Sequence, residues 1–124
     1  MPFEDPLGFS KVAEFLNERV DDFSDEGVFR TIIGRLYYSS FHSIRDRIYG
    51  HSKRSVNHGD LQDKAGIAAK AKGRERYITH YLSQLETMRD RADYDIHTAM
   101  GKEEVLKAYE VFFKIEGEFH EIWD

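Results

Sequence analysis

A helical period of apolar residues runs without interruption through residues 28–48, and it constrains the fold more than any other feature of the chain. The apolar side chains recur at steps of three and four residues, the spacing that places them on one face of an α-helix. The members of this stripe are Val28, Phe29, Ile32, Ile33, Leu36, Tyr37, Phe41, Ile44 and Ile48. The stripe predicts a long amphipathic helix of about six turns that ends near Gly50.

Shorter stripes of the same period predict four more helices. Both prolines lie within the first six residues, where Asp5 as N-cap and Pro6 as first helical residue favour a helix start. No segment alternates with a period of two, so no strand is predicted. The sequence therefore predicts an all-α fold, an up-and-down bundle of four main helices plus one short helix. Besides the helix that ends near Gly50, the expected helices are 6–21, a short one over 60–71 capped by Asp60 and ended by Gly73, one from about 74 into 89–97, and one over 102–122.

The length of 124 residues predicts one domain over 1–124, because most domains have about 100–150 residues. With 40% hydrophobic residues the chain has enough apolar surface to bury a core. Absence of cysteine excludes disulfides, thiolate metal sites and cysteine nucleophiles. No apolar run is long enough to span a membrane, and the acidic start is unlike a signal peptide, so a cytoplasmic location is expected. The stretch 50–60 has no periodicity and is expected to be a mobile loop.

The net charge of −5 is distributed unevenly along the chain. Residues 1–34 carry −5, residues 35–91 carry +6 and residues 92–124 carry −6. A basic middle segment suits a polyanionic partner such as RNA, and the alternative is that these are solvated helix faces which happen to differ in charge. The residues expected to contact phosphates are Lys53, Arg54, Lys72, Arg74 and Arg76.

Residues 89–97 form the densest cluster of ionisable groups, at the end of the fourth expected helix. On a continuous helix Asp90, Asp93, Tyr94 and His97 share one face, and Arg89 pairs with Asp93 four residues on. One interpretation is a set of intrahelical ion pairs on a solvated surface, each worth about 0.3–0.5 kcal/mol. The other interpretation is a site.

Three sequence elements resemble the HEPN superfamily. They are RLYYSSFHSIRDRI at 35–48, NHGDL at 57–61 and RADYD at 91–95, which are similar to the R-x-YY-x-x-FH and ADYD elements of small prokaryotic members. The resemblance implies a bundle of four to five helices that forms a homodimer. It also implies a metal-independent endoribonuclease without a cofactor. Many members are the toxin half of a toxin–antitoxin pair whose partner is a nucleotidyltransferase.

Active members of the superfamily carry an arginine, four to six residues and then a histidine near the end of the third long helix. Two alignments of this chain are open. Arg91 and His97 have five residues between them and fit the motif, whereas Arg89 places Tyr94 where the histidine is expected. In the first alignment His97 transfers protons, Arg91 holds the phosphate and Asp93 orients the imidazole, with Asp90 and Tyr94 beside them.

The geometry of a helix limits this assignment, because a step of six residues turns by about 240° around a straight helix. Arg91 and His97 therefore converge only if the helix ends or bends between them, or if two copies in a dimer complete each other. The residues 97–101 favour a helix end at that point.

The remaining histidines and aromatic residues have simpler interpretations. We expect His42 to be a core or interface histidine and His58 to be solvated in the loop; His80 completes no metal site. Tyrosines near Arg35 and Arg76 are expected in the core or a dimer interface rather than stacked on RNA bases. Two alternative functions stay open: an inactive HEPN protein that binds RNA, a nucleotide or a nucleotidyltransferase, and a small-molecule sensor that uses a groove of the bundle.

Overall fold

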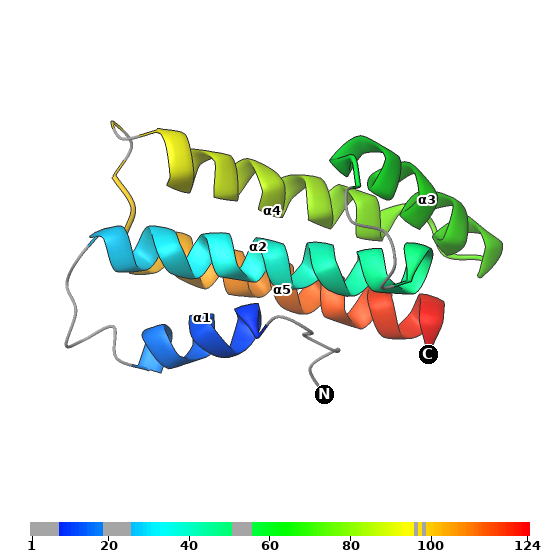
Figure 1. Ribbon diagram of the computed structural model, residues 1–124, viewed down its shortest axis with the longest axis horizontal. Helices are drawn as coiled ribbons and strands as arrows, with labels where there is room; N and C mark the ends of the chain where they lie inside the picture. Colours follow the sequence, from blue (N-terminus) through cyan, green and yellow to red (C-terminus); the bar gives the residue numbers. More distant parts are fainter. Residues whose placement is uncertain (1–7, 19–25, 51–55, 96, 98) are drawn as a thin grey trace.

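The computed structural model describes residues 8–18, 26–50, 56–95, 97 and 99–124, and within these ranges it contains helices and no strand. The helices are α1 (Phe9–Glu18), α2 (Glu26–Tyr49), α3 (His58–Ala71), α4 (Tyr77–Tyr94) and α5 (Lys102–Trp123). Figure 1 shows α2, α4 and α5 aligned along the long axis, with α1 beside α2 and α3 beside the start of α4. The expected all-α bundle is confirmed.

Helix α2 lies at the centre and contacts each of the other four helices. Its apolar stripe is buried as the spacing predicts, and Ile32, Ile33 and Leu36 have no exposed surface. Three buried serines, Ser39, Ser40 and Ser43, extend the covered part of the helix beyond the apolar stripe. Their small side chains leave room for neighbouring helices, so α2 is buried on more than one side.

Glycines end two helices where the sequence predicts. Gly50 follows α2 with a φ of +75°, and Gly73 follows α3 with a φ of +70°. Only glycine adopts this left-handed conformation without strain, and it turns the chain out of the helix. The Gly73 N–H donates to the carbonyl of Lys70 at 3.0 Å, as a helix C-terminus requires.

The predicted start of α3 at Asp60 is wrong. Helix α3 begins at His58, and its N-cap is Asn57, whose Oδ1 accepts hydrogen bonds from the N–H groups of Gly59 at 2.8 Å and Asp60 at 3.2 Å. Residues 58–60 are therefore helical and do not belong to a loop over 50–60. Residues 51–55 of that expected loop lie outside the described residues.

The other helix boundaries differ from expectation at their ends. Helix α4 begins at Tyr77 instead of about residue 74, and α5 matches the expected range to within one residue. The start of α5 is capped by Glu104, whose Oε1 accepts from the Gly101 N–H at 3.3 Å. The outer parts of the expected first helix, with Asp5 and Pro6, lie outside the described residues.

Candidate functional site

The C-terminal end of α4 is fixed by an arginine from α2. The Arg30 Nη1 group donates to the carbonyl oxygens of Arg91, Ala92 and Asp95, each at 3.0 Å. The last carbonyls of a helix have no partner within the helix, so a cation at this position satisfies them and complements the helix dipole. Helix α4 consequently ends at Tyr94, earlier than the expected end near residues 97–101.

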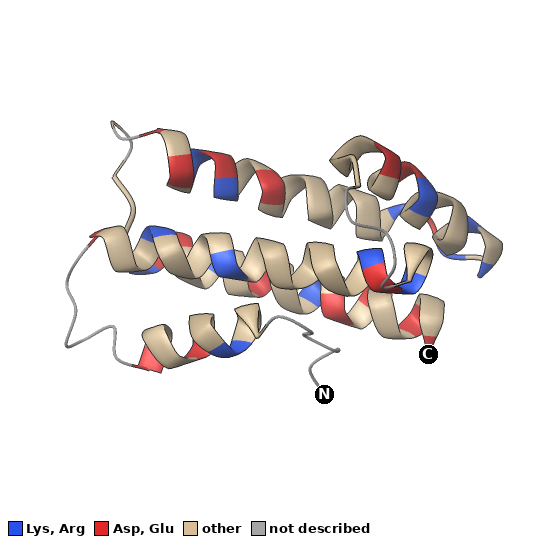
Figure 2. Cartoon of the chain, in the orientation of Figure 1, with Lys and Arg blue, Asp and Glu red and all other residues tan. Residues whose placement is uncertain are grey.

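Charged residues gather in the second half of α4, and Figure 2 shows acidic and basic groups alternating there. Arg89 and Arg91 differ sharply in their surroundings. The Arg89 side chain is 11% exposed, and its guanidinium lies over the rings of Tyr37 at 5.1 Å and Tyr38 at 5.4 Å. It also pairs with Asp90 at 3.2 Å and Asp93 at 3.4 Å. Arg89 is therefore a packed residue between α4 and α2.

Arg91 is exposed, and its guanidinium has no ion pair or hydrogen bond within the described part of the chain. The sequence does contain a signal that separates the two arginines. Buried residues of α4 recur as Ile78, Leu82, Leu85 and Ala92, and Arg89 falls on this stripe whereas Arg91 does not. Of the two arginines, only Arg91 is available to bind a ligand.

The expected partners of Arg91 are distributed over different surfaces. Arg91, Asp90 and Tyr94 line one surface pocket, and Tyr94 is 74% exposed there. His97 is exposed beyond the helix end, where its backbone N–H donates to Asp95 Oδ1 at 3.2 Å. His97 does not line that pocket. The helix end required for convergence thus lies between Arg91 and His97, and His97 lines neither of the two described pockets that contain Arg91.

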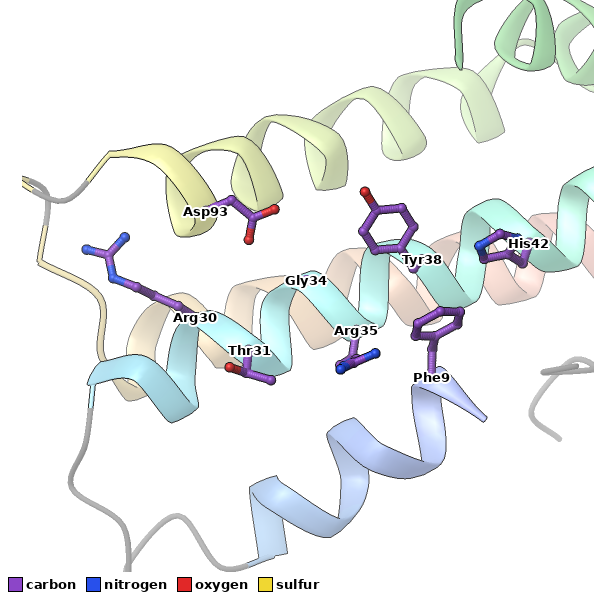
Figure 3. A pocket seen from close by; sticks show the side chains of 8 residues that line it. All are labelled: Phe9, Arg30, Thr31, Gly34, Arg35, Tyr38, His42 and Asp93. Carbon is purple, nitrogen blue, oxygen red and sulfur yellow. The ribbon is translucent and has the colours of Figure 1, made fainter. Parts of the chain in front are cut away.

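The contacts that the structure gives Asp93 are with Arg89 and α2, so its expected role in orienting the His97 imidazole stays a prediction. Asp93 Oδ2 pairs with Arg89, and the residue faces α2. There it lines a pocket of about 400 Å³ together with Arg35, Tyr38 and His42 of α2 and Phe9 of α1 (Figure 3). Gly34 also lines the pocket, and a Cβ atom there would make an ordinary contact with Asp93 Oδ1 at 3.7 Å.

Aromatic rings stack along this pocket. The His42 ring is nearly parallel to that of Phe9 at 5.3 Å and is inclined by 28° to that of Tyr38 at 6.0 Å, and the Arg35 guanidinium lies 5.4 Å from the Phe9 ring. The packed position expected for His42 agrees with these contacts. Two of the elements that carried the HEPN resemblance, 35–48 and the one that contains Asp93, therefore meet in one pocket.

The third element, at 57–61, reaches the same helix through a partly buried polar network that no periodic pattern in the sequence predicts. The Tyr37 hydroxyl donates to Glu86 Oε2 at 2.8 Å and is bonded to His58 Nδ1, which lies 3.1 Å from the same carboxylate oxygen. Burial, and then the hydrogen bond to Glu86, raise the pKa of Tyr37 well above its usual range. The prediction that His58 is solvated in a loop is wrong, because its ring stacks on Phe41 at 4.3 Å.

The predicted phosphate-contacting residues are only partly available. Arg74 is paired with Glu118 through a hydrogen bond of 3.3 Å from Nε, and its Nη1 lies 3.6 Å from Glu121, so its charge is already neutralised. The Arg76 side chain crosses Gly66 of α3, where a Cβ atom would come within 3.2 Å of its Nε. Lys72 is exposed at the end of α3, and Lys53 and Arg54 lie outside the described residues.

The described residues contain no group of three or more histidine or acidic side chains arranged to hold a metal ion. None of the described helices combines the length and the apolar character needed to cross a bilayer.

Comparison with known proteins gives one relative. The chain is similar to the uncharacterized protein MJ0628 of Methanocaldococcus jannaschii, with 32% identity over 108 residues. The alignment covers 75% of this chain and spans 64% of the length of that protein. No family model matches the chain, and no solved structure matches it significantly.

Proposed function

We propose that the protein is a metal-independent endoribonuclease of the HEPN type, a toxin-like or defence component that cleaves RNA at the α4 end of a homodimer. The end of α4 at Tyr94 carries this proposal, because it leaves the unpaired Arg91 guanidinium and the exposed His97 on either side of one helix terminus. The meeting of elements 35–48, 57–61 and 91–95 around α2 supports the HEPN assignment.

The chemistry follows from the two side chains. Attack of the RNA 2′-hydroxyl on its own phosphodiester needs a group that moves protons near neutral pH, and histidine, here His97, is the side chain best suited to that role. The Arg91 guanidinium presents two parallel N–H donors to the phosphate and stabilises the charge that develops on it. Arg89 takes no part in the chemistry, because its guanidinium is committed to Tyr37, Tyr38 and Asp93.

A dimer is part of the proposal because His97 lines neither of the two pockets described around Arg91. In a two-fold dimer, Arg91 of one copy and His97 of the other would line each of two equivalent sites. A nucleotidyltransferase partner that restrains the activity belongs to the same proposal, and its co-expression is expected to suppress cleavage.

The test is cleavage of a structured RNA in the presence of EDTA. We expect His97→Ala and Arg91→Ala to lower the rate by about 10²–10⁴-fold, the usual contribution of such groups. His80→Ala removes another exposed histidine of α4 and is the matched control, with an unchanged rate expected. Unchanged cleavage in both site variants would remove the assignment.

Mixing the two inactive variants tests the shared site. Half of the randomly formed dimers would contain one variant of each kind, and each such dimer would hold one intact site, so about one quarter of the wild-type activity should return. No recovery on mixing would exclude a site that is shared between copies.

A second function, RNA or partner binding without catalysis, is favoured by one observation. The pocket beside Arg91 contains the phenol of Tyr94 instead of an imidazole. Absence of cleavage by the wild-type protein, together with RNA binding that weakens on Arg91→Ala substitution, would establish this alternative.

A further inference from the structure

Helices α4 and α5 enclose a groove that shares Arg91 with the proposed cleavage site and is otherwise separate from it. The two helices run antiparallel and are joined by a short connection. The groove has a volume of about 550 Å³ and is closed at its base by Ile33 of α2. A volume of this size lies in the range of pockets that hold small organic molecules, and such pockets often lie between the helices of bundles.

The floor of the groove is apolar and adaptable. Besides Ile33 it is formed by Met88 of α4, Val111 of α5 and Met100 in the connection. Methionine has an unbranched and polarizable side chain, which fits apolar ligands of different shape. The floor is therefore suited to the apolar body of a ligand.

Of the three cations that line the groove, Arg91 of α4 and Lys107 of α5 are the nearest in sequence to the connection between the two helices. Lys114 Nζ lies 5.5 Å from the ring centroid of Tyr81, which fixes the register of the two helices. Seven residues from this pair toward the connection are Met88 on α4 and Lys107 on α5, which therefore lie at the same level of the two helices. Arg91 follows Met88 by about one turn of α4. Arg91 and Lys107 both line the groove, and neither has an ion pair among the described residues.

The cations that line the groove outnumber its carboxylates. Glu104 accepts a hydrogen bond from the Gly101 N–H and so serves the start of its own helix. Glu110 also lines the groove, where it leaves the three cations Arg91, Lys107 and Lys114 in excess over two carboxylates. Cationic side chains on the rim of an apolar groove favour a ligand that carries a negative charge at one end.

We propose that this groove binds an amphiphilic organic anion, with its apolar body on Met88, Met100 and Val111 and its anionic group between Arg91 and Lys107. The anionic group is a carboxylate or a phosphate monoester. Each presents two oxygens that match the two parallel N–H donors of the Arg91 guanidinium. The inference does not depend on RNA cleavage, since Lys107 and the methionines have no role there.

Methionine methyl NMR tests the proposal directly, because the chain has only three methionines and two of them line the groove. The probes are decanoate, decyl phosphate and 1-decanol, which share one alkyl chain and differ in the head group. The Met88 and Met100 methyl signals are assigned with Met→Leu variants. We expect both signals to shift when decanoate or decyl phosphate is added. Comparing the affinities of these two anions shows whether the site prefers a carboxylate or a phosphate. Decanol should bind at least tenfold more weakly.

Variants separate the charged end of the groove from its floor. Lys107→Ala is expected to weaken binding of the anion by about tenfold, and Arg91→Ala by as much, whereas Lys70→Ala on α3 should leave it unchanged. Shifts that are absent at millimolar concentrations of both anions would overturn the proposal, as would equal affinity for decanol or full affinity in Lys107→Ala. Because RNA cleavage is measured separately, failure here leaves the proposed nuclease untouched.

Discussion

Arg89 and Arg91 are two residues apart on one helix, yet the structure gives them opposite energetic roles. Replacing Arg89 by alanine removes a largely desolvated guanidinium from the faces of Tyr37 and Tyr38, a contact worth about 2 kcal/mol. It also removes the pairs with Asp90 and Asp93, whose partly exposed carboxylates make them worth about 0.5 kcal/mol together. Loss of the packed methylene stem adds about 1 kcal/mol.

One term opposes these losses. The Arg89 Nε group is buried without a hydrogen-bond partner among the described residues, and its removal recovers about 1 kcal/mol. The expected net loss in free energy of unfolding is therefore about 2–3 kcal/mol for Arg89→Ala. Arg91→Ala, at an exposed and unpaired position, is expected to change stability by less than about 0.5 kcal/mol.

Urea unfolding followed by circular dichroism measures both variants. With a slope of about 1–3 kcal/mol per molar urea, the midpoint of Arg89→Ala should fall by about 1–2 M, while that of Arg91→Ala stays near wild type. Arg89→Lys keeps the charge but loses the planar guanidinium, and its urea midpoint should lie between those of Arg89→Ala and the wild type. Equal midpoints for Arg89→Ala and Arg91→Ala would refute the distinction between a packed and a free arginine.

Three further outcomes are expected. Asn57→Ala removes the acceptor for two N–H groups of α3 and should cost about 1 kcal/mol in urea unfolding, while Asn57→Asp should cost little. Ser40→Ala removes a buried hydroxyl that has no partner among the described residues, so the midpoint temperature should stay equal or rise, and a clear fall would reveal a missing partner. Because burial raises the pKa of Tyr37 and brings that of Tyr109 to about 12, the folded state retains protons that the unfolded state loses above about pH 10. Stability is therefore complete below pH 10 and should fall at higher pH by up to about 1.4 kcal/mol per pH unit for each tyrosine, and Tyr37→Phe should reduce this slope.

Local signals determine most of the fold, and this is why the helices were predictable from sequence. The period of α2 and the glycines at 50 and 73 act over a few residues, so their effects do not depend on the rest of the chain. The start of α3 was missed because Asn57 and Asp60 are both good N-cap residues. The choice between them depends on packing, since a start at His58 adds the turn that brings His58 onto Phe41.

The end of α4 and the candidate site depend on contacts between distant residues. Arg30 determines where α4 ends although it lies more than sixty residues earlier in the chain. No periodicity could show that contact, nor the hydrogen bonds between Tyr37, His58 and Glu86. The distinction between Arg89 and Arg91 was present in the apolar period of α4, in which Arg89 occupies a core position.

The Tyr37 hydroxyl joins three helices at one atom, and this has a consequence for how the molecule opens. Detaching α3 withdraws His58, which leaves Tyr37 and Glu86 to satisfy each other and uncovers the Tyr37 ring beneath Arg89. Helix α3 should therefore open before the middle of α4, which the Tyr37–Glu86 hydrogen bond still holds to α2. Amide protons of α3 should exchange with solvent deuterium at a lower free energy than those in the middle of α4.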